Sequence, residues 1–407
     1  MSTNRKIKLQ RTKTIAVVSD IVMPTVKSEY LMGIAKYAQE RHNFTIRSVD
    51  LANIRSGNPL DGCDGVIMDT DESDVIELVK AAGLPIVDTT CATSDPALIG
   101  VDNDIRRMGN MAAEWFLRRG FRSFAYCGVE PEESIGFAET AAKAGCSCLI
   151  YDEEKITKVK PRKDHLARLL AGLKAWIPTL PPRTAVLCMN DIRAQHFLQT
   201  CLKLGRAVPD DIAVMGQHND IAICTCSPVT ITSIDANMRG VAYAAMRILD
   251  QAIDHPVKPK LRPTFRVRPV GIVERESTAT YPVNPPRLAK VLLLLDSNLD
   301  KPISAADLAN AAGVSQTALQ KSFRKAFGTT VGKYILSTKM HTARRLLSEE
   351  GLSVKEVAAK TGFSTPNYFC QTYHAHFGHP PSSDRIQRHD VIIISRRASA
   401  GGSSARR

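Results

Sequence analysis

The sequence has 407 residues, too many for one ordinary hydrophobic core, and its 44% hydrophobic and 23% charged residues are typical of a globular protein with two or three domains. Its ten cysteines include no CxxC pair, which argues against a structural zinc site and favours reduced thiols. The net charge is +13; residues 283–407 hold 18 Lys/Arg against 8 Asp/Glu and residues 1–282 hold 36 against 33, so the C-terminal segment is expected to have a polyanionic partner.

The N-terminal residues 1–13 form a short basic extension that leads directly into a strand-like run and contain no signal peptide. The apolar run at residues 291–295 is far too short to cross a bilayer. We therefore expect a cytoplasmic protein that has no membrane partner.

Between residues 14 and 280 the hydrophobic pattern alternates between short strands and amphipathic helices. Strands are predicted at 14–19, 44–50, 65–69, 85–89, 124–128, 148–152, 185–189 and 212–216, and helices at 29–40, 74–83, 108–120, 134–144, 165–177 and 192–205. This alternation is typical of parallel sheets covered by helices on both faces. Such sheets bind ligands at the carboxyl ends of their strands.

Short polar side chains recur in the loops that follow these strands, namely Asp20, Asp104, Asn190, Asp191, His218 and Asn219. Carboxylates and amides can each form two hydrogen bonds to adjacent sugar hydroxyls. Asp and Asn also cap helices and close turns, which explains any single one of these residues equally well, but their recurrence favours a ligand site. The loops contain no GxSxG, Walker A, GxGxxG or HExxH motif, so we expect no catalytic residues, no metal and no cofactor.

Several segments resemble the sugar-binding domain of LacI-type regulators: DNDIRRMGNMAAEWFLRRGFRSFAYCG, AVLCMNDIRAQHFLQTCLKLGRAVPDDIAVMGQHND, SPVTITSIDANMRGVAYAAMRILDQAI and RPVGIVERESTA. The resemblance covers residues 14–280. It implies a two-lobed α/β domain of the type I periplasmic-binding-protein kind, with a small sugar bound between the lobes.

By this resemblance, five residues stand at effector contacts or in the corresponding loops: Asp20, Asp104, Asp191, His218 and Asn219. His218 replaces a more common aspartate, and Glu133 stands where the family often has a ligand-binding arginine. Only about a dozen residues precede the first strand, so the N-terminal DNA-binding headpiece of LacI regulators is not expected. DNA binding is then expected at the other end of the chain.

A proline-rich linker at residues 281–286 separates this domain from an entirely helical segment, residues 287–390. Ser304 and Asp307 form a capping-box pattern, and Ser315 is a natural N-cap for a helix over 316–326. A helix, a glycine-containing turn and a second capped helix are the order of a helix-turn-helix.

The same pattern occurs a second time. Three small residues recur 49 positions later: Ala309, Gly313 and Ser315 correspond to Ala358, Gly362 and Ser364. Four further residues recur 50 positions later: Leu319, Phe323, Phe327 and Gly328 correspond to Phe369, Tyr373, Phe377 and Gly378. The one-residue difference between the two spacings falls in the turn of the second copy. There Thr365 can cap the following helix and Pro366 suits its first position. The helix between the copies presents Ile335, Met340, Ala343, Leu346 and Leu347 to both, and this spacer could place the two reading helices about 34 Å apart.

Residues 287–388 resemble the AraC/XylS DNA-binding domain, including the long linker helix and the TGFS…YF…FG…P signature. The resemblance assigns DNA contacts to Ser315, Gln316, Thr317, Gln320, Lys321 and Arg324 in the first helix-turn-helix and to Thr365, Asn367, Gln371 and His374 in the second. Gln can pair with adenine, and Lys and Arg can serve guanine or phosphate.

The second helix-turn-helix departs from the family in three places: Gln371 replaces an arginine, His374-Ala375 replace a basic pair, and Asp384 replaces an aromatic residue. Fewer cations should weaken its phosphate contacts. His374, His376 and His379 are expected to point in different directions on a helix and the segment that follows it, which argues against a metal site. The basic tail, residues 391–407, is expected to be disordered.

A LacI-like sensor followed by an AraC-like reader resembles the layout of xylose operon regulators of the XylR type. This resemblance implies a sugar-responsive transcription regulator, often an activator that also contacts RNA polymerase. It implies a homodimer that binds double-stranded promoter or operator DNA at direct-repeat half-sites. Two alternatives are a constitutive DNA-binding regulator that has lost ligand sensing and, less favoured, a sugar-modifying enzyme with a helical appendage.

Overall fold

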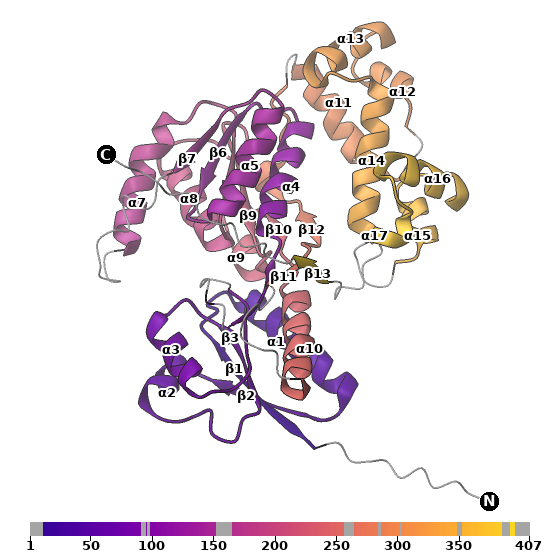
Figure 1. The fold of residues 1–407 in the computed structure, drawn as a ribbon. Coiled ribbons are helices and arrows are strands. Elements are labelled where there is room, and N and C mark those ends of the chain that lie inside the picture. Colours follow the sequence, from indigo (N-terminus) through magenta and orange to yellow (C-terminus); the bar gives the residue numbers. More distant parts are fainter. Residues whose placement is uncertain are drawn as a thin grey trace, which may run out of the picture. The chain divides into compact units, whose positions relative to one another are not determined.

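The computed structural model describes residues 11–90, 95, 98–151, 165–255, 264–283, 286–301, 303–347, 352–384 and 391–394 (Figure 1). The chain divides into two compact units. The first unit comprises Met1–Asp104, Asn237–Arg268 and His389–Arg407, and the second comprises Ile105–Ala236 and Pro269–Arg388.

The first unit is built on a seven-stranded sheet in the order β13-β11-β5-β4-β3-β1-β2. Its strands are β1 (Lys13–Ser19), β2 (Phe44–Val49), β3 (Gly65–Asp69), β4 (Ile86–Asp88), β5 (Ile99–Asn103), β11 (Thr264–Val267) and β13 (Val391–Ile394). Neighbouring strands are parallel, except that β13 is antiparallel to β11. The carboxyl ends of the parallel strands therefore share one edge of the sheet.

Both faces of this sheet are buried, because alternate residues of a strand point to opposite sides. Ile15 and Val17 pack with helices α1 (Pro24–Arg41) and α10 (Met238–Asp254), whereas Ala16 and Val18 pack with α2 (Leu51–Ser56) and α3 (Ser73–Ala81). Helices α1 and α10 lie side by side (Figure 1), and a Cβ at position 33 would overlap the carbonyl oxygen of Arg239, so the close approach needs glycine.

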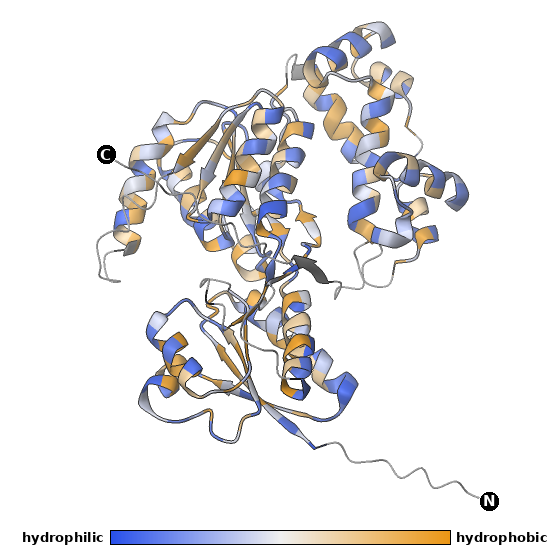
Figure 2. Cartoon of the chain, in the orientation of Figure 1, coloured by the Kyte–Doolittle hydropathy of each residue, from blue (hydrophilic) through white to orange (hydrophobic). Residues whose placement is uncertain are grey.

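The second unit contains a six-stranded sheet in the order β12-β10-β9-β8-β6-β7. Its strands are β6 (Ser123–Cys127), β7 (Cys148–Tyr151), β8 (Thr184–Cys188), β9 (Ile212–Gln217), β10 (Thr232–Asp235) and β12 (Gly271–Val273), and only the β10–β12 pair is antiparallel among these described strands. We call this sheet and its helices the second lobe. Figure 2 shows hydrophobic residues concentrated on the strands of both sheets.

Helices cover both faces of this sheet too. Helices α4 (Ile105–Arg118) and α5 (Pro131–Lys143) pack on one face around Phe116, Phe124 and Phe137, and α7 (His165–Trp176) and α8 (Asp191–Lys203) pack on the other. Short turns at α9 (Ile221–Thr225), Ile177–Thr179 and Glu276–Thr278 complete the lobe. Glycines 109 and 136 bring α4 and α5 together, because a Cβ at either position would overlap the backbone of the other helix.

The rest of the second unit is a helical domain with the helices α11 (Pro286–Asp296), α12 (Ala305–Ala311), α13 (Gln316–Phe327), α14 (Val331–Leu347), α15 (Val354–Lys360), α16 (Pro366–Phe377) and α17 (Pro381–Asp384). The pairs α12–α13 and α15–α16 are the two predicted helix-turn-helix copies. The capping box of Ser304 and Asp307 is present, and a matching box of Ser353 and Glu356 begins the second pair.

The second helices of the two pairs are capped as the sequence predicts. The Ser315 hydroxyl accepts a hydrogen bond from the Ala318 N–H, and the Thr365 hydroxyl accepts one from the Tyr368 N–H, both at 3.2 Å. Both helices end at a glycine in the left-handed conformation, Gly328 and Gly378. The local signals of the sequence therefore define both ends of each of these helices.

Helix α14 belongs to both cores of the helical domain. Val331, Tyr334 and Ile335 pack with the first pair, and Met340 and Ala343 pack with the second. A single helix shared between two cores holds the pairs at a fixed spacing, as the pattern of apolar residues predicts.

Two segments differ from their predictions. Within the predicted linker, Tyr281 and Val283 are each only 6% exposed and belong to the core of the helical domain. Residues 391–394, predicted as part of a disordered tail, form strand β13, because a run of β-branched residues favours pairing with the edge of β11. The rest of the predicted tail lies outside the described residues.

Within the described part of the chain, no helix is both long enough and apolar enough to cross a membrane.

Candidate ligand site and nucleic-acid interface

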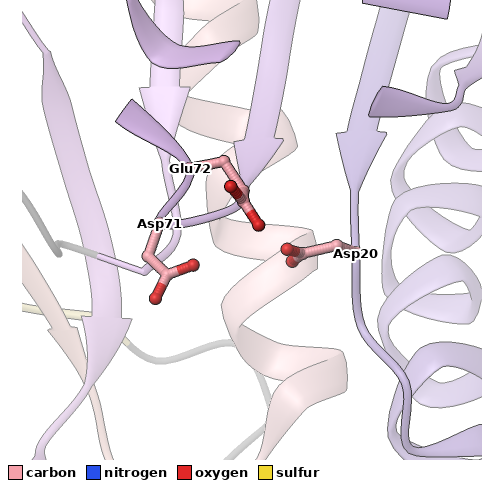
Figure 3. A group of neighbouring side chains, drawn as sticks. All are labelled: Asp20, Asp71 and Glu72. Carbon is pink, nitrogen blue, oxygen red and sulfur yellow. The ribbon is translucent and has the colours of Figure 1, made fainter. Parts of the chain in front are cut away.

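The carboxyl edge of the first unit is strongly acidic. Asp20 follows β1, and Asp71 and Glu72 follow β3; one carboxylate oxygen from each of the three lies within 4.8 Å of the other two (Figure 3). The Thr70 hydroxyl donates to Asp20 at 3.1 Å. Among the described residues, this is the one group of His, Cys, Asp or Glu side chains placed to hold a metal ion.

Two further carboxyl groups lie under this edge. Asp69, at the end of β3, is 9% exposed and accepts a hydrogen bond from the Thr89 hydroxyl at 2.7 Å. Burial raises the pKa of Asp69 to about 6. Asp88, at the end of β4, accepts from the Thr90 hydroxyl at 2.8 Å. The edge therefore carries five carboxyl groups, a setting that repels anionic ligands and offers hydrogen-bond acceptors to hydroxyl groups.

Asp104 follows β5, and its backbone N–H donates to the Val267 carbonyl at 2.9 Å. Its neighbour Asp102 has a structural role, because it accepts from the Arg266 guanidinium at 2.7 Å and from the Asn103 N–H at 2.6 Å. Asp104, rather than Asp102, is therefore the better ligand candidate at this strand end, and its contact with an effector stays a prediction.

In the second lobe, Asp191 is fully buried at the start of α8. One carboxylate oxygen accepts from the Ser233 hydroxyl at 2.6 Å, and the other accepts from the Asp220 N–H at 2.7 Å. Burial raises the pKa of Asp191 to about 7. Both oxygens thus hold the strand ends together, which gives this residue a structural role whether or not it meets an effector.

Asn190 precedes Asp191 and caps α8, since its side-chain oxygen accepts from the Arg193 N–H at 2.8 Å. Its amide nitrogen has no hydrogen-bond partner among the described residues, so it remains available as a donor. The sequence singled out this residue as polar, but the resemblance pointed to its neighbour.

His218 and Asn219 follow β9, and both have positive φ angles, 84° and 55°. The Asn219 side-chain oxygen accepts from the Arg275 guanidinium at 2.7 Å, which fixes its orientation. Burial lowers the pKa of His218 to about 4, so its ring is neutral, and its Nδ1 atom is buried without a partner among the described residues. A strained pair of polar residues at a strand end is a common feature of binding sites.

Glu133 is the site candidate that the predicted residue set does not include. It lies in the first turn of α5 and is 1% exposed, and one carboxyl oxygen accepts from the Tyr126 hydroxyl at 2.8 Å. The other oxygen has no partner among the described residues. Burial raises the pKa of Glu133 to about 8, so near neutral pH this group is a neutral carboxylic acid that can donate a hydrogen bond. Its place in the sequence, where an arginine is common, was the available signal.

The first helix of the nucleic-acid interface is α13. Gln316, Thr317, Lys321 and Arg324 are exposed, as the prediction requires. Ser315 is exposed but serves as the cap, and the Gln320 side-chain oxygen accepts from the Val331 N–H at 3.2 Å, which ties it to α14. The exposed groups include two cations, which suit guanine edges or phosphate.

The corresponding helix α16 exposes Asn367, Gln371 and His374, and its N-cap residue Thr365 is exposed as well. Tyr368, which the prediction omits, is 56% exposed on the same helix. No basic residue of this helix is exposed other than histidine, so its electrostatic attraction to phosphate is weaker than that of α13.

Asp384 explains one departure from the AraC/XylS pattern. It is 3% exposed, accepts from the Tyr373 hydroxyl at 2.6 Å and pairs with Arg344 at 3.2 Å. A carboxylate with these two partners fills the closing position of the second helix pair, where the family has an aromatic residue.

Comparison with known proteins agrees with this architecture. Residues 113–278 match a model described as a periplasmic binding protein-like domain, and residues 308–387 match a helix-turn-helix domain. The xylose operon regulatory protein of Escherichia coli K12 is 26% identical over 343 residues, which cover 81% of this chain and 86% of that protein. Its counterpart from Haemophilus influenzae is 22% identical over 335 residues, 79% of this chain and 85% of the relative.

A solved structure described as the xylose-binding transcription activator xylR covers 92% of this chain and 99% of its own, with 23% identity and a TM-score of 0.55. The predicted fold class is confirmed by these matches, and the relatives are named as regulators rather than enzymes. The chain therefore consists of a two-lobed periplasmic-binding-protein-like domain and a C-terminal helix-turn-helix domain, in the layout of the XylR-type regulators that it resembles over most of its length.

Proposed function

We propose that this protein is a DNA-binding transcription regulator whose affinity for DNA is controlled by a small uncharged sugar, xylose or a related monosaccharide. The proposal rests on one observation, the combination of two features in a single chain. The strand ends carry buried polar groups without partners among the described residues, and two capped helix pairs expose polar side chains. The relatives named for the xylose operon support the choice of sugar.

The electrostatics of the strand ends favour a neutral ligand. Asp20, Asp69, Asp71, Glu72 and Asp88 gather at the edge of the first unit, and a sugar phosphate or a sugar acid would be repelled there. In the second lobe, the neutral carboxylic acid of Glu133 and the amide of Asn190 can donate hydrogen bonds to hydroxyl oxygens. Of the remaining predicted contacts, Asp104 belongs to the first unit and His218 and Asn219 belong to the second lobe, and each has polar groups that suit a polyol.

On the DNA side, helix α13 reads base edges through Gln316, Lys321 and Arg324, and helix α16 adds Asn367 and Gln371. A homodimer would present four such helices to direct-repeat half-sites in promoter DNA. Activation through RNA polymerase and a cytoplasmic location belong to the same proposal, as does the absence of catalysis.

A titration of the full-length protein with DNA from upstream of its own neighbouring genes tests the proposal. The DNA affinity should change when xylose is added, and xylose phosphate should have no effect at the same concentration. If DNA binds but none of a panel of pentoses and hexoses alters the affinity, the constitutive alternative replaces the sugar-controlled one. Turnover of a sugar by the protein would favour the enzyme alternative instead.

A further inference from the structure

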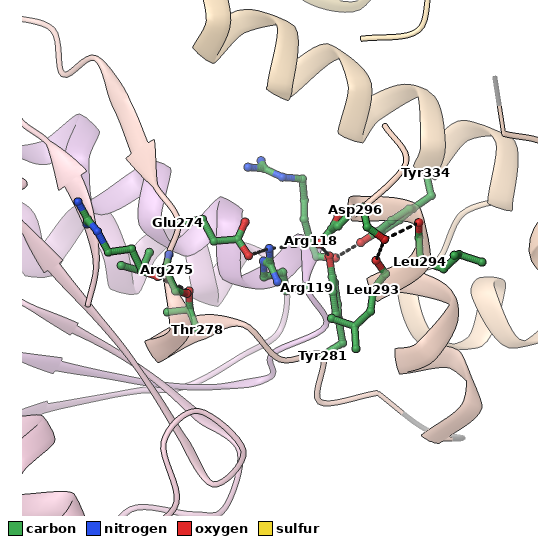
Figure 4. A network of polar contacts seen from close by, with 12 residues as sticks. Arg118, Arg119, Glu274, Arg275, Thr278, Tyr281, Leu293, Leu294, Asp296 and Tyr334 are labelled. Carbon is green, nitrogen blue, oxygen red and sulfur yellow. Dashed lines mark hydrogen bonds and ion pairs between the residues drawn. The ribbon is translucent and has the colours of Figure 1, made fainter. Parts of the chain in front are cut away.

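The second lobe and the helical domain meet within one compact unit, and the end of helix α4 lies at their junction. Arg118 is the last residue of α4, and Arg119 follows it directly. Around them lie Tyr281 of the connecting segment, Asp296 at the end of α11 and Tyr334 of α14 (Figure 4). The junction is polar, which is unusual for a buried contact.

Arg119 is the centre of this junction. It is 6% exposed, and its guanidinium lies 4.2 Å from the ring centroid of Trp115 and 4.7 Å from that of Tyr281. The same guanidinium pairs with Glu274 of the lobe and, at 3.3 Å, with Asp296 of the helical domain. Tyr281 in turn donates its hydroxyl proton to Asp296. One cation thus joins the two domains through a stacked and ion-paired geometry that favours a single orientation.

Neighbouring residues reinforce this orientation through the backbone. The Tyr334 hydroxyl donates to the Arg118 carbonyl at 2.8 Å, and the Arg122 guanidinium donates to the Ala326 carbonyl at 2.8 Å. Ala326 is in the last turn of α13, the helix with the exposed cations. A Cβ at position 120 would overlap Val283, so Gly120 allows the close packing.

Helix α4 also reaches the ligand side of the lobe. It has 14 residues and is about 21 Å long at 1.5 Å per residue. Near its start, Gly109 packs directly against the backbone of Glu133, and Gly136 of α5 packs against Arg106. One helix therefore packs near one end against the backbone of Glu133, whose carboxyl group has an unpaired buried oxygen, and leads directly into Arg119 at the other end.

We propose that Arg119 is a positioning residue that couples effector binding to DNA reading: through Asp296 of α11 and Tyr281 it fixes the helical domain to the end of α4, so that a shift of α4 or α5 caused by the effector moves this domain and, with it, the first reading helix. The inference rests on the proposed function. It predicts that loss of Arg119 separates the two activities, leaving sugar binding and DNA binding in place while their coupling disappears.

The test uses the full-length protein with xylose and its promoter DNA. The coupling factor is the ratio of DNA dissociation constants without and with saturating xylose, and such factors are typically about 5- to 150-fold. In Arg119→Met it should fall below about 2-fold, while xylose affinity by calorimetry stays close to that of the wild type. Lys174→Met, which removes an exposed cation from α7 on the opposite face of the lobe, should keep the wild-type coupling factor.

Tyr334→Phe provides a milder second variant, because it removes only the hydroxyl that bonds the Arg118 carbonyl. A reduced coupling factor in this variant supports the inference even if Arg119→Met does not fold. A folded Arg119→Met variant with the wild-type coupling factor overturns the inference and leaves the proposed function intact. An equal loss of DNA affinity with and without xylose has the same meaning, because it leaves the coupling factor unchanged. A wild-type protein with no response to xylose would instead refute the proposed function on which the inference rests.

Discussion

Polar residues at the strand ends of the second lobe divide into those that hold the fold and those with unused hydrogen-bonding groups. Asp191 belongs to the first kind, since both of its oxygens have partners inside the lobe. Asn190 and His218 belong to the second kind, because each has a nitrogen without a partner among the described residues. This division separates the effect of a substitution on stability from its effect on ligand affinity.

Asp191→Ala should therefore act mainly on stability. It leaves the Ser233 hydroxyl and the Asp220 N–H unpaired in a buried site, which we expect to cost about 2–4 kcal/mol of unfolding free energy. Urea unfolding followed by circular dichroism measures the change. Asp20→Ala, an acidic residue at the edge of the first sheet, should change the free energy by less than about 0.5 kcal/mol. An unchanged unfolding midpoint together with lost xylose binding would show that Asp191 contacts the sugar directly.

Glu133 should make stability depend on pH. Its pKa is about 8 in the folded protein and about 4.3 in an unfolded chain, so its contribution to stability is complete below about pH 4.3 and is lost as the pH rises to about 8. Glu133→Gln mimics the protonated acid and lacks this dependence. The unfolding free energy of the variant minus that of the wild type should therefore increase by on the order of 2–4 kcal/mol from pH 5 to pH 8.5.

Denaturant titrations at the two pH values measure this gain. Glu132→Gln is the matched control, because Glu132 is next to Glu133 in sequence but has an exposed carboxylate that pairs with Arg106 at the surface. A similar pH response in both variants would mean that Glu133 ionises like an ordinary surface acid.

At the scale of elements, the two helix pairs share caps, glycine ends and aromatic cores but differ in exposed charge. Lys321→Ala in α13 should weaken DNA binding by about 1–3 kcal/mol and reduce the dependence of log K on log salt by about 1. Gln371→Ala in α16 removes no charge, so it should cost less affinity and leave the salt dependence unchanged. Fluorescence anisotropy at several salt concentrations measures both quantities.

Lys203→Ala serves as the charge control for this pair, since Lys203 is exposed at the end of α8 in the lobe. It should bind DNA like the wild type. Equal losses for Lys321→Ala and Gln371→Ala would show that the second helix pair reads DNA as strongly as the first, in spite of its missing cations.

At the scale of the whole molecule, the sequence predicts those features that depend on local signals. Alternating apolar residues predict the sheets, and Ser304, Ser315, Thr365 and Gly378 mark helix ends because caps act within one turn. The role of Asp191 could not be predicted in this way, since its partners Ser233 and Asp220 are distant in sequence. The same holds for Glu133 and Arg119, whose burial and pairing depend on tertiary packing.

The coupling of two sites in one chain leads to a prediction that belongs to the whole molecule. If xylose changes DNA affinity by a given factor, thermodynamic linkage requires that DNA change xylose affinity by the same factor. Calorimetric titration of xylose into the protein, first free and then saturated with promoter DNA, should therefore give two dissociation constants whose ratio equals the coupling factor from anisotropy. In Arg119→Met both ratios should fall together toward one. A ratio that falls in only one of the two measurements would break the linkage, and would show that the DNA titration reports a process such as subunit assembly in addition to binding.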